Sequence, residues 1–488
     1  MAIKIKSTPN KSTAIDPAKL NRATRRKLGH LLFSPEPGLS IVNPNAAGID
    51  VGNGNHYVAV PPDRDPQHVR TFESHTADLN RIAEWLKQCR IDTIAMQATG
   101  VYWIALYDIL CAHGLKVILV NAQYTKNVPG RKTDVQECQW LMKLHAYGLL
   151  RDSFHLPERM QRIRTLWRLR DGHVKEASQA VQHMQKALTT MNIQLANAIS
   201  DISGVTGQAI IAAILKGERD PYTLAGFRDR HIRASREEVA RSLEGNWRDD
   251  HLFALKQAVD SYPFAHKQME ECDKLLQSYM AALPTQPLAT ASEAAGPERQ
   301  KNGKKKKSKK AKGNAPKLFD LRAELARIAG VDLASIDGID VMTAQTIIAE
   351  IGTDLSQFPD EDHFASWLGL CPYKNVTGGK VVGRARRKVN SRVAVALRTA
   401  ATTLRKSNSY LGSKYRHLQF NLASKKAAVK AMARYLAVLV YRLLTYGQAW
   451  VDRGAARFEQ DREKREMAAL TARAAAKGQK LVPIDAVN

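Results

Sequence analysis

The order of apolar segments between about residue 47 and residue 120 most constrains the fold of this chain. Three short strand-like segments come first, "AAGIDVGN", "HYVAV" and "HVRTF", and a helix, a strand, a second helix and the strand "KVILV" follow them. Consecutive strands pair as an antiparallel meander, whereas strands separated by helices pair in parallel. The pattern therefore predicts an α/β domain in which helices flank a mixed sheet.

This order of three strands, helix, strand, helix and strand is that of the ribonuclease H-like fold. Further along, apolar residues at helical spacing predict a long amphipathic helix from Met160 to about Ile199 and a second one from Asp250 to Ala282. The two helices predict an antiparallel helical insertion or a coiled-coil arm, which is a common oligomer contact.

The rest of the chain divides by composition. Residues 283–316 are rich in lysine and poor in bulky apolar residues, so they are expected to form a disordered linker. Leu333 to Gly352 are expected to form two helices around a glycine turn, either a helix-hairpin-helix that binds nucleic-acid backbone or an ordinary helical hairpin. A turn-rich basic stretch follows, then helices to about Tyr446 and a charged tail.

The charge of the chain indicates its class of partner. Lys and Arg number 74 against 47 Asp and Glu, which gives a net charge of +27. Such a basic chain suits a polyanion, with nucleic acid the first candidate and a ribosome or an anionic membrane surface as alternatives. The sequence shows no secretory signal, membrane span or zinc-type cysteine spacing, so a cytoplasmic, nucleoid-associated protein is expected.

Two carboxylates in "NVPGRKTDVQECQWL" admit two interpretations. Asp134 and Glu137 lie three residues apart at the start of a predicted helix, directly behind Arg131 and Lys132. Asp134 at the N-cap with Glu137 at the third helical position would be an acidic capping pair. Alternatively, both carboxylates point into one cleft and hold a divalent metal, which requires a third acid from elsewhere.

Asp50 can supply that third acid, because it lies at the end of the first predicted strand. Three converging carboxylates would suit two-metal phosphoryl transfer, with cations roughly 3.5–4 Å apart. Gln97 ends the next internal strand, at a position where a metal site of this kind is expected to have a carboxylate. Its amide oxygen can coordinate Mg²⁺ but adds no negative charge.

Four segments, "GIDVGN", "ATGVYWIALYDIL", "VNAQYTKNVPGRKTDVQECQWL" and "SWLGLCPYKNVTGGKVVGR", carry a resemblance to a known family. Together they resemble the insertion-sequence transposases with a RuvC-like DEDD domain, the group that includes bridge-RNA-guided recombinases and pilin-type DNA invertases. The likeness covers nearly the whole chain apart from the N-terminal extension and the lysine-rich linker. It favours the metal-binding interpretation of Asp134 and Glu137 over the capping pair.

The resemblance implies a two-part active site. The DEDD tetrad falls on Asp50, Gln97, Asp134 and Glu137, with Mg²⁺ as the cofactor held by the three carboxylates. The family's C-terminal serine nucleophile corresponds to Thr377, and Ser391 is the alternative. Gln97 and Thr377 depart from the family pattern. Three explanations remain open: they are tolerated variants of a working enzyme, they mark a degenerate copy, or they are substitutions made to trap a complex.

Basic residues near both parts of this site are expected to bind nucleic acid. They are Arg131, Lys132, Lys374, Lys380, Arg384, Arg386, Arg387, Lys388 and Arg392. Around Thr377 they are interleaved with glycines, which let backbone approach phosphate while guanidinium groups hold it. A solvated basic loop is the simpler alternative.

The domain organisation follows from the resemblance and the composition. We expect a basic N-terminal extension (1–40), a RuvC-like DEDD catalytic domain (41–157), a helical or coiled-coil arm (158–284), a lysine-rich disordered linker (285–316), a C-terminal transposase domain with the nucleophile (317–450) and a charged tail (451–488). The fold class is thus α/β plus all-α.

The function that the resemblance implies is that of a DNA transposase or recombinase. A hydroxyl nucleophile attacks donor and target DNA, the strands are exchanged, and a guide RNA encoded by the element specifies both sites in a dimer or tetramer. One alternative is a RuvC-type junction nuclease that hydrolyses DNA with water. Another is a catalytically impaired homologue that only binds nucleic acid.

Overall fold

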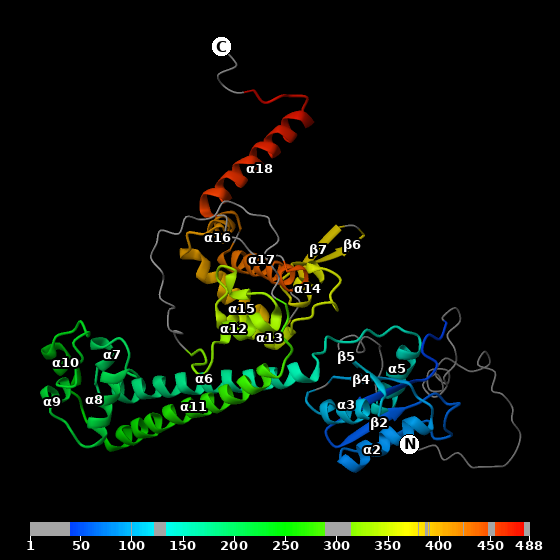
Figure 1. Ribbon diagram of the computed structural model, residues 1–488, viewed down its shortest axis with the longest axis horizontal. Coiled ribbons are helices and arrows are strands. Elements are labelled where there is room, and N and C mark those ends of the chain that lie inside the picture. Colours follow the sequence, from blue (N-terminus) through cyan, green and yellow to red (C-terminus); the bar gives the residue numbers. More distant parts are fainter. Residues whose placement is uncertain are drawn as a thin grey trace, which may run out of the picture. The chain divides into compact units, whose positions relative to one another are not determined.

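The computed structural model describes residues 40–98, 100–121, 133–287, 314–378, 380–385, 389, 391–422, 424–447 and 454–482. The chain forms two compact units, Met1–His155 and Leu156–Asn488, which are described separately (Figure 1). The predicted N-terminal extension and the lysines of the predicted linker lie outside the described residues.

The N-terminal unit contains a five-stranded sheet with strand order β3-β2-β1-β4-β5. β1 pairs with β2 in antiparallel and with β4 in parallel, so the predicted mixed sheet and its order of elements are confirmed and are consistent with a ribonuclease H-like domain. The elements are β1 (Ala46–Val51), β2 (Asn55–Ala59), β3 (Val69–Glu73), α2 (Thr76–Gln88), β4 (Thr93–Gln97), α3 (Trp103–Ala112), β5 (Lys116–Val120) and α5 (Asp134–Ala146).

The two faces of this sheet are covered by different helices. Side chains alternate between the faces along a strand, so Ile49 and Val51 point to one side and Gly48 and Asp50 to the other. Ile49 and Val51 belong to the main core, which they share with apolar residues of α2 and α3. The opposite face packs against α5, where Cys138 and Met142 are buried.

The C-terminal unit contains the predicted antiparallel helix pair, formed by α6 (Glu158–Thr190) and α11 (Asp249–Ala281) (Figure 1). Arg170 pairs with Asp273, and the more N-terminal Arg162 lies over the ring of Tyr279. Contacts therefore move backwards along α11 as they move forwards along α6, which confirms the antiparallel arrangement. That the pair is a coiled coil stays a prediction.

The expected length of the first arm helix is wrong, because α6 ends at Thr190 and not near Ile199. Asn192 has a φ of 57°, in the left-handed region that asparagine tolerates better than most residues and that ends a helix. The chain then forms a cluster of short helices around their own apolar core at the far end of the arm (Figure 1). These are α7 (Leu195–Ala198), α8 (Val205–Leu215), α9 (Pro221–Ala225) and α10 (Arg236–Leu243).

The remainder of the C-terminal unit is mainly helical, as predicted up to Tyr446. Its described elements are α12 (Leu321–Ala329), η2 (Leu333–Ser335), α13 (Val341–Ile351), α14 (Glu361–Trp367), β6 (Tyr373–Thr377), β7 (Lys380–Ala385), α15 (Arg392–Thr403), η3 (Leu404–Lys406), α16 (Tyr410–Asn421), α17 (Lys425–Tyr446) and α18 (Gly454–Ala476). Among the described helices, none combines the length and the hydrophobicity that a membrane crossing needs.

Two local expectations in this region need correction. The helix expected before Gly338 is a single 3-10 turn, Leu333–Ser335, and the second helix begins only after Asp340, whose carboxylate accepts the amide of Thr343 at 2.8 Å. The stretch after Pro372, expected to be rich in turns, contains a two-stranded antiparallel hairpin of β6 and β7. The helix-hairpin-helix stays a prediction.

Candidate active site

The first turn of α5 overturns the acidic capping pair. Thr133 is the N-cap: its hydroxyl accepts the Gln136 amide at 3.3 Å, and the Gln136 side chain accepts the Thr133 amide at 3.2 Å. Asp134 is therefore the first helical residue and Glu137 the fourth. Because Thr133 and Gln136 already form the capping box, neither carboxylate is needed to cap the helix.

Gly48 sets the position of α5 on the sheet. A Cβ atom at residue 48 would overlap the carbonyl oxygen of Cys138 and the amide nitrogen of Met142. The backbone of α5 thus lies directly against β1, an approach that only glycine permits. Asp50, two residues further along the strand, points to the same face. This contact brings the first turn of α5 to the carboxyl end of β1.

Gln97 joins the same face from the neighbouring strand. Gly48 pairs with Ala95 in the parallel β1–β4 ladder, so Gln97, two residues after Ala95, projects towards α5. The Gln97 side chain is buried, and its amide nitrogen donates to a carboxylate oxygen of Glu137 at 2.9 Å. An amide here stabilises the Glu137 carboxylate, whereas a second carboxylate would repel it.

Charge repulsion and burial act together on Asp50. Burial, then the nearby carboxylates of Glu137 and Asp134, raise the pKa of Asp50 from 3.8 to about 6. The same neighbourhood affects Cys138, where burial and the Asp50 carboxylate raise the thiol pKa to about 12. A partly buried carboxylate beside two further carboxylates, of which Asp134 is exposed, makes an environment that favours a bound cation.

The described side chains do not form a closed metal centre. Among the residues that the structure describes, no three His, Cys, Asp or Glu side chains are grouped so as to hold a metal ion. Glu137 and Asp134 are close enough to Asp50 to help raise its pKa, and Glu137 is held by Gln97. Their donor chemistry, carboxylate and amide oxygen, nevertheless fits a hard divalent cation.

The predicted nucleophile lies in the other unit, on the hairpin of β6 and β7. Thr377 is the last residue of β6 and is exposed, and it pairs across the turn with Lys380, which is also exposed. Gly378 follows with a φ of 57°, in the left-handed region that favours glycine. The hairpin thus presents a hydroxyl and an ammonium group together at its tip.

Ser391 and Arg392 have structural partners in this unit. Ser391 is the N-cap of α15, and its hydroxyl accepts the amide of Ala394 at 3.2 Å. The Arg392 guanidinium forms an ion pair with Asp171 of α6 at 3.0 Å and lies 3.8 Å from Glu350 of α13. Arg392 therefore ties α15 to the arm, a role that the sequence does not indicate.

The other residues expected to bind nucleic acid are only partly described. Lys374 and Arg384 occupy paired positions on β6 and β7. Arg131, Lys132, Arg386, Arg387 and Lys388 lie outside the described residues.

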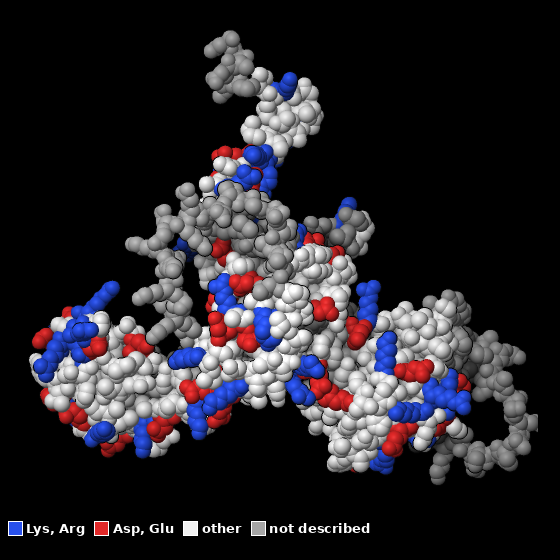
Figure 2. Space-filling model, in the orientation of Figure 1, with Lys and Arg blue, Asp and Glu red and all other residues white. Residues whose placement is uncertain are grey.

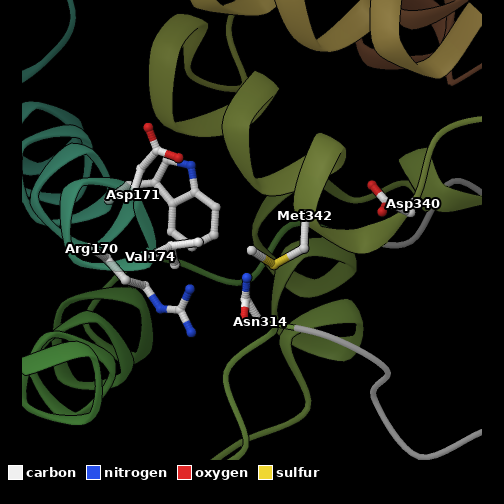
Figure 3. A pocket seen from close by; sticks show the side chains of 7 residues that line it. Arg170, Asp171, Val174, Asn314, Asp340 and Met342 are labelled. Atoms are coloured by element: carbon white, nitrogen blue, oxygen red, sulfur yellow. The ribbon is translucent and has the colours of Figure 1, made fainter. Parts of the chain in front are cut away.

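A cavity of about 290 Å³ in the C-terminal unit contains none of the predicted site residues (Figure 3). Arg170 and Asp171 point in different directions from α6 there, each towards its own ion-pair partner, and Asp340 caps α13. Its lining residues are Trp167, Arg170, Asp171, Val174, Asn314, Asp340 and Met342. The charged side chains that line the cavity thus already form ion pairs or cap a helix within the protein.

Sequence reasoning missed Gly48 as a residue of the site. A glycine two residues before a strand-end aspartate was the available signal, because residues i and i+2 of a strand share a face. It also missed Gln97 as a hydrogen-bond donor to Glu137, because no local pattern relates residues 40 positions apart.

Replacement of Gly48 by alanine is expected to displace α5 from β1 and separate Asp134 and Glu137 from Asp50. Overpacking of this kind destabilises by about 1–3 kcal/mol, and we expect strand cleavage to fall by at least roughly tenfold. Thermal unfolding and cleavage of DNA carrying the element's junction measure the two effects. Gly54→Ala is the matched control, since a Cβ there meets no atom within 4 Å. Equal activity of the two variants would contradict the role of Gly48.

Comparison with protein families gives two matches, one in the N-terminal part of the chain and one in the C-terminal part. Residues 47–193 match a transposase family model of the DEDD, IS110 type, and residues 331–416 match the model for the transposase IS116/IS110/IS902 family. The first match contains Asp50, Gln97, Asp134 and Glu137, and the second contains Thr377 and Ser391. No curated protein matches the chain. The two family matches show that this chain belongs to the IS110 family of insertion-sequence transposases, which are DNA-processing enzymes.

Proposed function

We propose that this transposase cleaves and exchanges DNA strands with Mg²⁺ at Asp50, Asp134 and Glu137 and with the hydroxyl of Thr377 as the nucleophile. The observation that carries the proposal is that Asp50 and Gln97 share the sheet face that packs against α5. There the Glu137 and Asp134 carboxylates help to raise the pKa of Asp50, and Gln97 donates to Glu137. A carboxylate whose pKa is raised by burial and by like charges is a poor stabiliser of a fold and a good ligand for a cation.

The three carboxylates would hold Mg²⁺, with the Gln97 amide oxygen as a neutral ligand. When bound there, the ion neutralises charge on a scissile phosphate and polarises it. Gln97 has a separate role in the chain itself, because its amide donates to Glu137 and fixes the orientation of that carboxylate. These residues would thus position a phosphate for attack by a nucleophile.

Thr377 suits the role of that nucleophile because it is exposed next to Lys380 at a hairpin tip. Its oxygen would form a bond to phosphorus while the bond between phosphorus and a strand oxygen breaks, and the leaving oxygen takes up a proton. Lys380 would hold the phosphate by its charge. The Ser391 hydroxyl is engaged as the cap of α15, which favours Thr377 over Ser391.

The remaining parts of the proposal concern partners. The net charge of +27 supports binding of both DNA and a guide RNA encoded by the element. The basic positions at and after the hairpin, Lys374, Lys380 and Arg384 with Arg386, Arg387 and Lys388, would contact phosphates. Because the metal ligands and the nucleophile belong to different units, assembly of a dimer or tetramer would allow one copy to complete the site of another.

Thr377→Ala is expected to abolish a covalent protein–DNA adduct on a nicked substrate that carries the element's junction, in the presence of Mg²⁺. The loss should exceed about 10³-fold because no other group replaces the nucleophile. Thr377→Ser should retain the adduct, and Ser391→Ala should keep at least roughly a third of it, since only a helix cap is lost. The adduct is measured as a slower band in denaturing electrophoresis.

The outcomes separate the competing functions. Mg²⁺-dependent cleavage without any adduct would identify a hydrolytic junction nuclease. Binding of RNA and DNA without cleavage, even after Gln97→Glu restores a fourth carboxylate, would identify a homologue that only binds nucleic acid. An adduct that survives Thr377→Ala and disappears in Ser391→Ala would move the nucleophile to Ser391.

A further inference from the structure

The start of α3 carries three large exposed apolar side chains. Val101 is 69%, Tyr102 46% and Ile104 41% exposed. The residue between the last two, Trp103, packs instead against the main core of the N-terminal unit. Three exposed apolar residues within four positions form a patch, and such patches mark interaction surfaces. Val101, Tyr102 and Ile104 are called the α3 patch below.

The α3 patch lies at the edge of the sheet that also carries the candidate site. β1 and β4 are parallel, and Ile49 pairs with Met96. Asp50 and Gln97 are therefore level with each other at the carboxyl ends of these strands. Tyr102 follows Gln97 by only five residues, at the N-terminal end of α3. Ligands of such sheets bind outside the carboxyl ends of the parallel strands, so a strand held at the carboxylates is expected to extend over this edge.

Gly100 supports the ring of Tyr102. The φ of Gly100 is 60°, in the left-handed region that favours glycine. A Cβ atom at residue 100 would meet two ring carbons of Tyr102, Cε2 at 3.4 Å and Cδ2 at 3.5 Å. The ring therefore lies against the backbone of the turn while much of the residue stays exposed. A ring held in this way loses little conformational freedom when a ligand binds to it.

The α3 patch differs from the surrounding surface in its lack of charge. Residues 100–107 include no Lys, Arg, Asp or Glu, in a chain whose net charge is +27. Figure 2 shows basic side chains on both units, with acidic ones among them. Basic side chains suit phosphates, whereas an aromatic ring beside aliphatic side chains suits the flat face of a base. The patch is thus complementary to bases and not to the DNA backbone.

We propose that Tyr102 stacks on a base of the DNA strand next to the phosphate that the carboxylates hold, with Val101 and Ile104 in contact with the edge of the same base. This inference rests on the proposed function and adds a contact with DNA bases to it. Strand exchange separates a base beside the cleaved phosphate from its old neighbour in the stack, and the Tyr102 ring takes the place of that neighbour. The strand end then stays in position for rejoining.

A protein partner fits the α3 patch less well. A stable protein interface buries about 800 Å² on each partner, which is far more than three side chains present. A single base, by contrast, needs only one exposed ring face and a few aliphatic contacts. The size of the patch therefore favours a base.

Photo-cross-linking of the full chain, with any RNA that co-purifies, tests the inference on DNA that carries the element's junction. 5-Iodouracil, which reacts on irradiation with an aromatic side chain stacked on it, replaces one base at a time on both sides of the junction phosphate. The Thr377→Ala variant in Ca²⁺ is used, so that strand cleavage does not interfere. We expect a cross-link to Tyr102 from a base directly beside the phosphate. Tyr102→Phe should retain this cross-link and Tyr102→Ala should lose it.

The affinity for junction DNA gives a second measurement. Tyr102→Ala should weaken binding by about tenfold, the effect of losing one stacked base. The dependence of the affinity on salt concentration should keep its slope, because no phosphate contact is lost. Tyr222→Ala is the matched control, since Tyr222 of α9 is 56% exposed, and it should leave the affinity unchanged. Unchanged thermal unfolding would show that each variant folds.

Four results would overturn the inference. The first is that no cross-link reaches Tyr102 from any position, and the second is that Tyr102→Ala binds DNA as tightly as the wild type. In the third, Tyr102→Phe binds as weakly as Tyr102→Ala, which would assign the effect to the hydroxyl and not to the ring. In the fourth, Tyr102→Ala changes the mass in sedimentation velocity and not the DNA affinity, which would make the patch a protein contact.

The test is independent of the covalent adduct. Cross-linking through Tyr102 in a protein that forms no adduct would overturn the proposed nucleophile and support the stacking contact. An adduct that forms normally without any cross-link to Tyr102 would do the reverse.

Discussion

Asp50→Asn is expected to abolish strand cleavage and at the same time to raise the thermal stability of the metal-free protein. The loss of cleavage should exceed about 10³-fold, because the variant removes one of the three carboxylates that are proposed to hold Mg²⁺. The gain in stability has a different cause. Burial, Glu137 and Asp134 raise the pKa of Asp50 to about 6, so its ionised form is unfavourable in the folded state. Asparagine removes that charge.

The effect on stability has a defined pH dependence. Asp50 releases its proton near pH 3.8 in the unfolded chain and near pH 6 in the folded chain. The folded state therefore binds more protons between these values, and its stability relative to the variant falls as pH rises through this window. Below about pH 4 the two proteins should differ little. At neutral pH the variant should be more stable by about 1–2 kcal/mol after allowance for solvent screening.

Thermal unfolding in EDTA at pH 4, 5, 6 and 7.5 measures this difference, and a titration with Mg²⁺ supplies the complementary result. Mg²⁺ should raise the unfolding temperature of the wild-type protein and have little effect on Asp50→Asn. Asp108→Asn, which removes an exposed carboxylate of α3 in the same unit, is the matched control. If Mg²⁺ stabilised Asp50→Asn as much as the wild type, Asp50 would not be a metal ligand.

Asp273→Ala is expected to destabilise the arm by about 3–5 kcal/mol, because it leaves the Arg170 guanidinium buried without its partner. The two side chains are 3% and 5% exposed and are joined by hydrogen bonds of 2.5 and 3.1 Å. Arg170 also lies over the Trp167 ring, with its guanidinium carbon 5.5 Å from the ring centroid. The pair thus joins α6 to α11 in an apolar environment.

Thermal unfolding followed by far-ultraviolet circular dichroism measures this loss. The double variant Arg170→Met with Asp273→Leu should recover most of it, since neither buried charge remains. Glu158→Ala is the matched control on the same helix: Arg162 and Glu158 form an ion pair whose side chains are 56% and 75% exposed, and its loss should change stability by at most about 0.5 kcal/mol. If Asp273→Ala lowered the stability by no more than Glu158→Ala does, the buried ion pair would contribute little to the stability of the arm.

The sequence by itself determined the kinds and order of the elements of the N-terminal unit and the helix pair of the arm. The period of two in "AAGIDVGN" and the helical spacing after Met160 are local patterns, so the order of strands and helices and the start of α11 could be predicted to within a few residues. The end of α6 could not, because it depends on the left-handed backbone of Asn192, a conformation that most asparagines do not adopt.

The tertiary structure decided how the candidate site is assembled. Asp134 and Glu137 could be predicted as a pair from their spacing, but whether they cap α5 or face the sheet depended on Thr133 and Gln136. Gly48 brings α5 against β1 across some 90 residues of chain, and Gln97 reaches Glu137 across 40 positions. A periodic pattern in the sequence shows which face of a single helix or strand is apolar. Which two distant faces pack together depends on the fit of their side chains in contact, and a single sequence contains no local signal for that fit.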